Sequence, residues 1–91
     1  MIICSCIVHF DLPYVQSLKG RRSVTNSLKE KLKAFNLSVL DISGEYAKEA
    51  DVAFVFLSAN SLQAAQYREK IEKMLENNFS EYHFELEYEE I

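Results

Sequence analysis

DVAFVFLSA, residues 51–59, contains the most continuous apolar run of the chain, from Val52 to Leu57. Asp51 and Asn60 bound this run. A strand whose successive residues are all apolar is buried on both faces, which is typical of a strand in the middle of a sheet. The run therefore predicts a central strand.

A second central strand is predicted at residues 2–10, where apolar residues and cysteines occupy both sides of the strand alternation. Pro13 is expected to end the segment, because proline has no amide hydrogen to donate to a neighbouring strand. Two further strands are predicted at residues 37–42, which are short and β-branched, and at residues 82–89, where apolar residues alternate with His83 and glutamates. The last strand therefore has one face in water and suits the edge of the sheet.

Two amphipathic helices are predicted between these strands. Apolar side chains recur every three or four residues from residue 21 to 35, and again from residue 61 to about residue 78. Asn60 or Ser61 is expected to cap the second helix, and Asn36 is expected to stop the first. The expected buried stripes comprise Val24, Leu28, Leu32 and Phe35 in the first helix, and Ala64, Tyr67, Ile71 and Met74 or Leu75 in the second.

The order strand-helix-strand-strand-helix-strand predicts an α+β fold of ferredoxin-like topology. Two right-handed crossovers most often close this order as a four-stranded antiparallel sheet, in the order 4-1-3-2, with both helices on one face. This topology places the first and third strands in the middle, as their apolar patterns independently predict. We expect residues 1–91 to form a single domain. Which sheet face the helices cover stays open, since both central strands are apolar on both faces.

The formal net charge of −4 conceals a segregation of charge along the chain. Residues 1–36 hold six Lys and Arg against two Asp and Glu, whereas residues 37–91 hold four against twelve. A basic region within an acidic protein predicts local contact with phosphates, and it argues against non-specific coating of DNA.

The first residues favour a cytoplasmic protein without membrane contact. They lack the basic start of a signal peptide, and His9 interrupts the apolar run long before the roughly 20 residues of a membrane span. Cys4 and Cys6 point the same way on the predicted strand, with Cβ atoms too far apart for a disulfide. Both cysteines therefore suit a reducing compartment.

The segments Leu12-Pro13, Ser17-Leu18-Lys19 and Arg22 resemble the hallmark of the YlxP-like family of small uncharacterised bacterial proteins. In that family Leu-Pro precedes Ser-Leu-Lys-x-Lys-Arg and a helix, and the similarity continues to residues 88–91, over nearly the whole chain. The resemblance implies a ferredoxin-like fold, a cytoplasmic location, and genes that often lie among those for translation and ribosome-maturation factors. It thus associates the chain with translation without implying a mechanism.

The leading functional hypothesis is RNA or ribosome association through a basic loop, residues 17–22, at the start of the first helix. Three cations, a hydroxyl and a glycine lie there beside free N–H groups and the positive end of the helix dipole, which together favour phosphate. The alternative is a solvated helix start whose arginines pair with the acidic half. The candidate phosphate contacts are Ser17, Lys19, Arg21, Arg22, Lys29 and Lys33.

The competing hypothesis is a homo-oligomeric interaction module, most simply a homodimer, with no role with nucleic acid. Phe54 and Phe56 are its candidate contacts on the sheet face. RNA-recognition domains of this topology stack bases on the first and third strands, but the Lys/Arg-Gly-aromatic opening of their motif is missing here. Self-association is the simpler account of the apolar sheet faces.

Catalysis is the less favoured class of function, because the chain contains no Gly-rich nucleotide loop, nucleophile elbow or zinc-binding spacing. We expect no cofactor. The residues that could form a metal site are His9, Asp11 and His83, since an antiparallel last strand beside the first would bring His83 toward His9. Solvated histidines at the sheet edge are the alternative.

Overall fold

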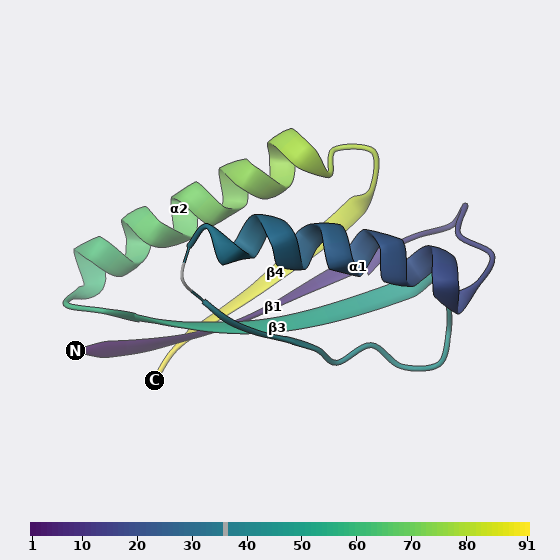
Figure 1. The fold of residues 1–91 in the computed structure, drawn as a ribbon. Coiled ribbons are helices and arrows are strands. Elements are labelled where there is room, and N and C mark those ends of the chain that lie inside the picture. Colours follow the sequence, from purple (N-terminus) through teal and green to yellow (C-terminus); the bar gives the residue numbers. More distant parts are fainter. Residues whose placement is uncertain (36) are drawn as a thin grey trace.

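The computed structural model describes residues 1–35 and 37–91, and in this part of the chain it shows four strands and two helices in the predicted order (Figure 1). The strands form one antiparallel sheet in the order β2-β3-β1-β4, and both helices lie on the same face of it. The ferredoxin-like α+β fold, with β1 and β3 in the centre, is confirmed. The elements are β1 (Ile2–Asp11), α1 (Leu18–Lys33), β2 (Ser38–Asp41), β3 (Glu49–Ser58), α2 (Ser61–Asn78) and β4 (His83–Glu90).

Both helices begin where a side chain satisfies an amide of the first turn. The structure starts α1 at Leu18 instead of residue 21, because the Ser17 hydroxyl accepts a hydrogen bond from the Gly20 amide at 3.0 Å. The cap of α2 is Asn60, one of the two predicted, and its side chain accepts from the Gln63 amide at 2.9 Å. The predicted stop of α1 at Asn36 lies outside the described residues.

The core lies between the helices and one face of the sheet. From residue 4 in β1 and residue 50 in β3, the even-numbered residues are buried beneath the helices, and the odd-numbered residues are partly or fully exposed. The predicted helix stripes cover this face, although Phe35, Tyr67 and Met74 are only half-buried. We call the uncovered side of the sheet, which carries the odd-numbered residues of β1, β3 and β4, the open face.

The edge strand β4 has the predicted wet face, with alternating half-buried and exposed residues. It pairs with β1 from Cys4 opposite Glu90 to Asp11 opposite His83, so the two ends of the chain lie at the same end of the sheet (Figure 1). Both cysteines are buried and unbridged. Neither described helix is long and apolar enough to cross a membrane.

Candidate functional site

Residues 17–22 were expected to form a loop, but the structure places residues 18–22 in the first turn of α1. Ser17 is the cap of this helix, and its hydroxyl already accepts the Gly20 amide hydrogen. Gly20 packs closely against Val15, since a Cβ at this position would lie 3.3 Å from Cγ1 of Val15. One of the amides expected to hold a phosphate is therefore used by the helix cap.

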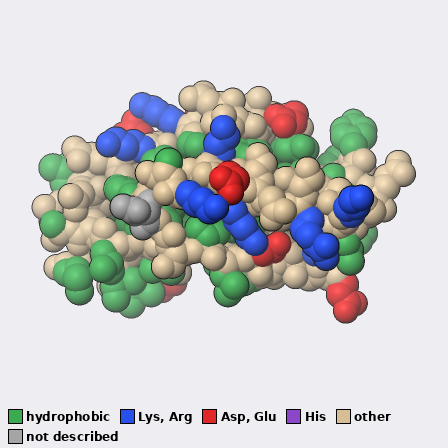
Figure 2. Space-filling model, viewed as in Figure 1, with side chains coloured by type: hydrophobic (Ala, Val, Ile, Leu, Met, Phe, Trp, Pro, Cys, Tyr) green, Lys and Arg blue, Asp and Glu red, His purple; other side chains and the backbone are tan. Residues whose placement is uncertain are grey.

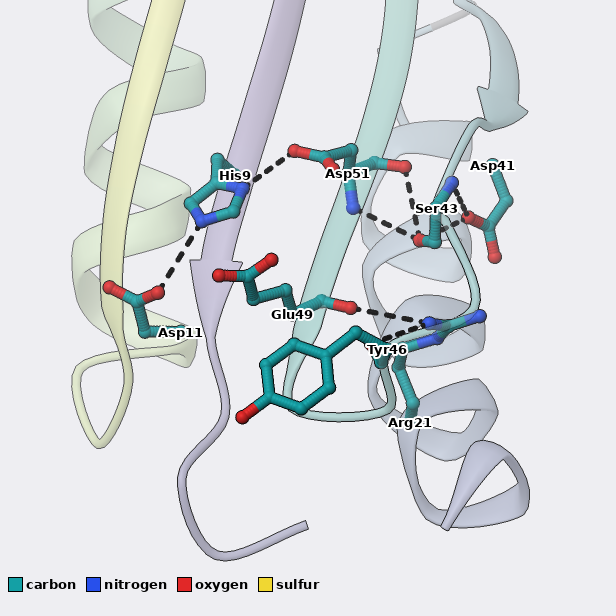
Figure 3. A network of polar contacts seen from close by, with 8 residues as sticks. All are labelled: His9, Asp11, Arg21, Asp41, Ser43, Tyr46, Glu49 and Asp51. Carbon is teal, nitrogen blue, oxygen red and sulfur yellow. Dashed lines mark hydrogen bonds and ion pairs between the residues drawn. The ribbon is translucent and has the colours of Figure 1, made fainter. Parts of the chain in front are cut away.

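Arg21 is held by the backbone of the connection between β2 and β3. Its Nη1 donates to the carbonyl oxygens of Gly44 at 2.7 Å and Tyr46 at 2.9 Å, and it lies 3.4 Å from that of Glu49 (Figure 3). Hydrogen bonds from a charged donor are stronger than those between neutral groups. Arg21 is therefore a clamp between α1 and this connection, which leaves it less available to a ligand than its neighbour Arg22, whose side chain is exposed.

The remaining candidate cations lie together on the solvent side of α1. At 3.6 residues per turn, Lys19, Arg22, Lys29 and Lys33 fall within an arc of about 80° and extend over about 21 Å of helix. Lys29 is half-buried and the other three are exposed. Glu30 is the one acidic residue of α1, and its carboxylate pairs with Lys33 at 2.9 Å. Figure 2 shows Lys and Arg side chains gathered on this face; we call these four cations the basic stripe.

Phe54 and Phe56 were expected on an exposed sheet face, but the structure buries both side chains. Both side chains point toward the helices, with exposures of 1% and 5%, and Phe56 stacks on Tyr67 with ring centroids 4.7 Å apart. The open face instead carries their neighbours Val55 and Leu57, of which Leu57 is 60% exposed. The exposed residues of β3 are thus shifted by one position from the predicted ones, because neighbouring residues of a strand point to opposite faces of the sheet.

A polar cluster occupies one end of the open face, where β1 and β3 pair. His9 lies opposite Asp51, and Asp11 lies opposite Glu49. The Nδ1 atom of His9 lies 2.6 Å from Oδ1 of Asp51, and its Nε2 lies 3.4 Å from Oδ1 of Asp11 (Figure 3). The hydrogen bond to Asp51 raises the pKa of His9 above its ordinary value, and the negative charges of Asp51 and Asp11 add to this effect against a smaller opposing contribution from burial.

The predicted trio of His9, Asp11 and His83 is brought together only in part. His83 lies opposite Asp11 in the pairing of β1 with β4, but its Nε2 is 3.9 Å from the carboxylate of Glu85. Glu49 completes a group with His9 and Asp11, since one potential ligand atom from each lies within 4.8 Å of the others. Glu49 was not predicted here, because it precedes residues 51–59, the segment in which the central strand was expected. The alternation of Glu49 and Asp51 with apolar residues is the signal that would have placed it on the strand.

Comparisons with known proteins agree with this fold and assign no activity. Residues 3–88 match the model of a family described as protein of unknown function (DUF503). Among curated proteins, none matches the chain. Among solved structures, the de novo designed protein Foldit4 is similar, with a TM-score of 0.54 and 13% identity over 97% of this chain and 94% of that chain. At this identity the likeness shows a shared fold alone.

Proposed function

The chain belongs to the DUF503 family of proteins of unknown function, and we propose that it is a non-enzymatic protein that associates with RNA or the ribosome through its basic stripe. The observation that carries the proposal is the placement of four cations on the exposed side of one helix, with Glu30 as the single acidic residue of that helix. Such a surface attracts phosphates even on an acidic protein, because screening confines electrostatic effects to about 8 Å at physiological salt.

The length of the basic stripe suits an extended nucleic-acid backbone. A duplex strand presents one phosphate for about every 3.4 Å of its axis, so about 21 Å of helix lies beside roughly six phosphates. A single bound phosphate would occupy only one end of the stripe. The geometry therefore supports a polyanion better than a small anion.

The acidic residues favour one orientation of the bound nucleic acid. Glu85, Glu87 and Glu89 of β4 lie on the open face, on the opposite side of the sheet from the helices. Phosphates are repelled from that side and attracted to the helix layer. We therefore expect RNA to bind on the helix side of the sheet, along the basic stripe of α1.

Two further observations support RNA in the cytoplasm as the setting. The resemblance to YlxP-like proteins, whose genes often lie among those for translation factors, favours RNA over other polyanions. The buried, unbridged Cys4 and Cys6 agree with a reducing compartment.

The test is fluorescence anisotropy with a 20-nucleotide single-stranded RNA, accompanied by co-sedimentation with ribosomal subunits. If three or four phosphates are neutralised, the affinity should fall roughly 20- to 50-fold between 50 and 200 mM salt. Lys19→Glu combined with Arg22→Glu should abolish binding. The matched control is Lys70→Glu with Lys73→Glu, which makes the same charge change at exposed positions of α2 and should retain most of the affinity.

Three results would overturn the proposal: affinity that does not change with salt, binding that survives the α1 charge reversal, or equal losses in the α1 and α2 variants. Arg21 stays unchanged in all variants, because its clamp to the β2–β3 connection would confound lost binding with lost stability.

Self-association through the open face is a second candidate, and exposed aliphatic side chains favour it. Leu40 and Leu57 are 65% and 60% exposed, and Leu40 of β2 belongs to the open face because it pairs with Ala53 of β3. Ile3, which lies opposite Leu57 in the sheet, is 37% exposed. A second copy of the chain would cover these residues. Sedimentation equilibrium should then show a dimer that Leu57→Glu dissociates and that Lys19→Glu with Arg22→Glu leaves intact. A wild-type monomer at every concentration would exclude this candidate.

A further inference from the structure

The polar cluster on the open face brings together one imidazole and two carboxylates that could hold a metal ion. Potential ligand atoms of His9, Asp11 and Glu49 lie within 4.8 Å of one another. Ligand atoms about 2.1 Å from a tetrahedral ion lie about 3.4 Å apart, and this is the observed distance from Nε2 of His9 to Oδ1 of Asp11. Glu49 has a flexible side chain at an exposed position and can close the remaining distance by a rotamer change.

The imidazole is already oriented as it is in many metal centres. Metal-binding histidines usually donate their second ring N–H to a carboxylate, which fixes the tautomer and the direction of the free nitrogen. Here Asp51 accepts that hydrogen bond from Nδ1 of His9, so Nε2 is directed toward Asp11 (Figure 3). Asp51 is itself anchored, because its amide donates to the Ser43 hydroxyl at 3.0 Å, and Ser43 donates to Asp41 at 2.5 Å.

Among the described residues, no Lys or Arg forms an ion pair with the carboxylates of the cluster, and His9 is their one basic partner. None of the ion pairs found there joins Lys or Arg to Asp11, Glu49 or Asp51. Lys48, next to Glu49 in the sequence, donates to the Pro13 carbonyl at 2.7 Å, and Arg21 donates to backbone carbonyls of the β2–β3 connection. The strand positions therefore keep three negative charges around one histidine, which attracts a cation.

We propose that His9, Asp11 and Glu49 bind a divalent transition-metal ion such as Zn²⁺, with Asp51 as the residue that positions His9. One nitrogen and two carboxylate oxygens suit this class of ion, and water completes the coordination. The site revises the expectation of no cofactor, and it replaces His83 by Glu49 in the predicted trio. It lies on the open face, so it is independent of the RNA contact proposed for α1.

The test is isothermal titration of EDTA-stripped protein with Zn²⁺ and, for a spectroscopic signal, with Co²⁺. We expect one ion per chain and visible Co²⁺ absorption bands. Asp11→Asn and Glu49→Gln should each weaken binding at least tenfold, and Asp51→Asn should weaken it about 10- to 100-fold. The matched controls are His83→Ala and Glu85→Gln, which remove neighbouring groups of the same chemistry and should change the affinity less than threefold.

The absence of binding at millimolar metal would overturn the proposal. So would binding that survives both Asp11→Asn and Glu49→Gln, or that is lost in the His83 and Glu85 controls. Circular dichroism in EDTA establishes that each variant is folded. Mn²⁺ added to the labelled wild-type protein gives a readout without any substitution, because it should broaden NMR signals of His9, Asp11 and Glu49 before those of other residues.

Discussion

Replacing Arg21 by Ala should destabilise the fold, whereas the same change at the adjacent Arg22 should not. The two residues have identical side chains and are neighbours in α1. Arg21 donates to the carbonyl oxygens of Gly44 and Tyr46, while the structure gives Arg22 no side-chain hydrogen bond or ion pair among the described residues. The pair therefore separates a structural arginine from one that is available to a ligand.

The magnitude follows from the hydrogen bonds that are lost. Hydrogen bonds to charged groups contribute about 1.5–3 kcal/mol each, but these carbonyls are near the surface and water replaces the lost donor. We therefore expect Arg21→Ala to lower the free energy of unfolding by about 1–2 kcal/mol in total. For a chain of this size that lowers Tm by roughly 4–16 °C. Arg22→Ala should change stability by less than about 0.5 kcal/mol.

The assay is thermal and urea unfolding followed by far-UV circular dichroism, with RNA binding measured on the same samples below both transitions. Arg21→Lys distinguishes the shape of the guanidinium from its charge, and it should be nearly as unstable as Arg21→Ala. Equal stability of Arg21→Ala and Arg22→Ala, or full stability of Arg21→Lys, would refute the clamp. Arg22→Ala alone should weaken RNA binding.

Three other predictions follow from burial and hydrogen bonding. Burial raises the pKa of the Cys6 thiol to about 12, so mass spectrometry should find Cys6 unalkylated by iodoacetamide at pH 8 until the protein unfolds; rapid labelling would contradict this burial. The hydrogen bond between His9 and Asp51 raises the pKa of His9 in the folded protein. This contact therefore stabilises the metal-free fold fully at pH values below 6.5, the ordinary pKa of histidine, and the stabilisation is lost as the pH rises through the folded-state pKa. Urea unfolding in EDTA should show this pH dependence, and Asp51→Asn should remove it; an unchanged profile would exclude the contact as its source. Phe54→Ala should cost about 3–5 kcal/mol of unfolding free energy and Leu57→Ala less than about 0.5, whereas equal losses would be inconsistent with one covered face.

The apolar periodicity was sufficient to predict the order of the strands in the sheet, because two strands that are apolar on both faces belong in the centre and a strand with one polar face suits an edge. It could not predict which side of β3 is buried. Val55 and Leu57 are as apolar as Phe54 and Phe56, so the pattern contains no signal for the face. The choice depends on the crossovers of the helices, which is a tertiary property.

The basic residues were recognisable as a group, but their separate roles were not. One step along a helix rotates a side chain by about 100°, and this rotation alone turns Arg21 toward the β2–β3 connection and Arg22 toward solvent. The trio proposed as a metal site included His9 and Asp11, which the structure places two residues apart on β1 with Nε2 and Oδ1 3.4 Å from each other. The trio missed Glu49 because the start of β3 was placed two residues too late, at Asp51.

The pairing of β1 with β4 has a consequence for how the chain folds. It joins segments from opposite ends of the sequence, so a nascent chain cannot cover this edge of β1 before residues 83–90 have been made. Pairings of such high contact order slow folding, and the uncovered edge exposes backbone groups to other chains in the meantime. Ile91 donates to the carbonyl of Ile3 at 2.8 Å, so a short linker could join the two ends. A circular permutant opened between β2 and β3 would turn this slow pairing into a local hairpin.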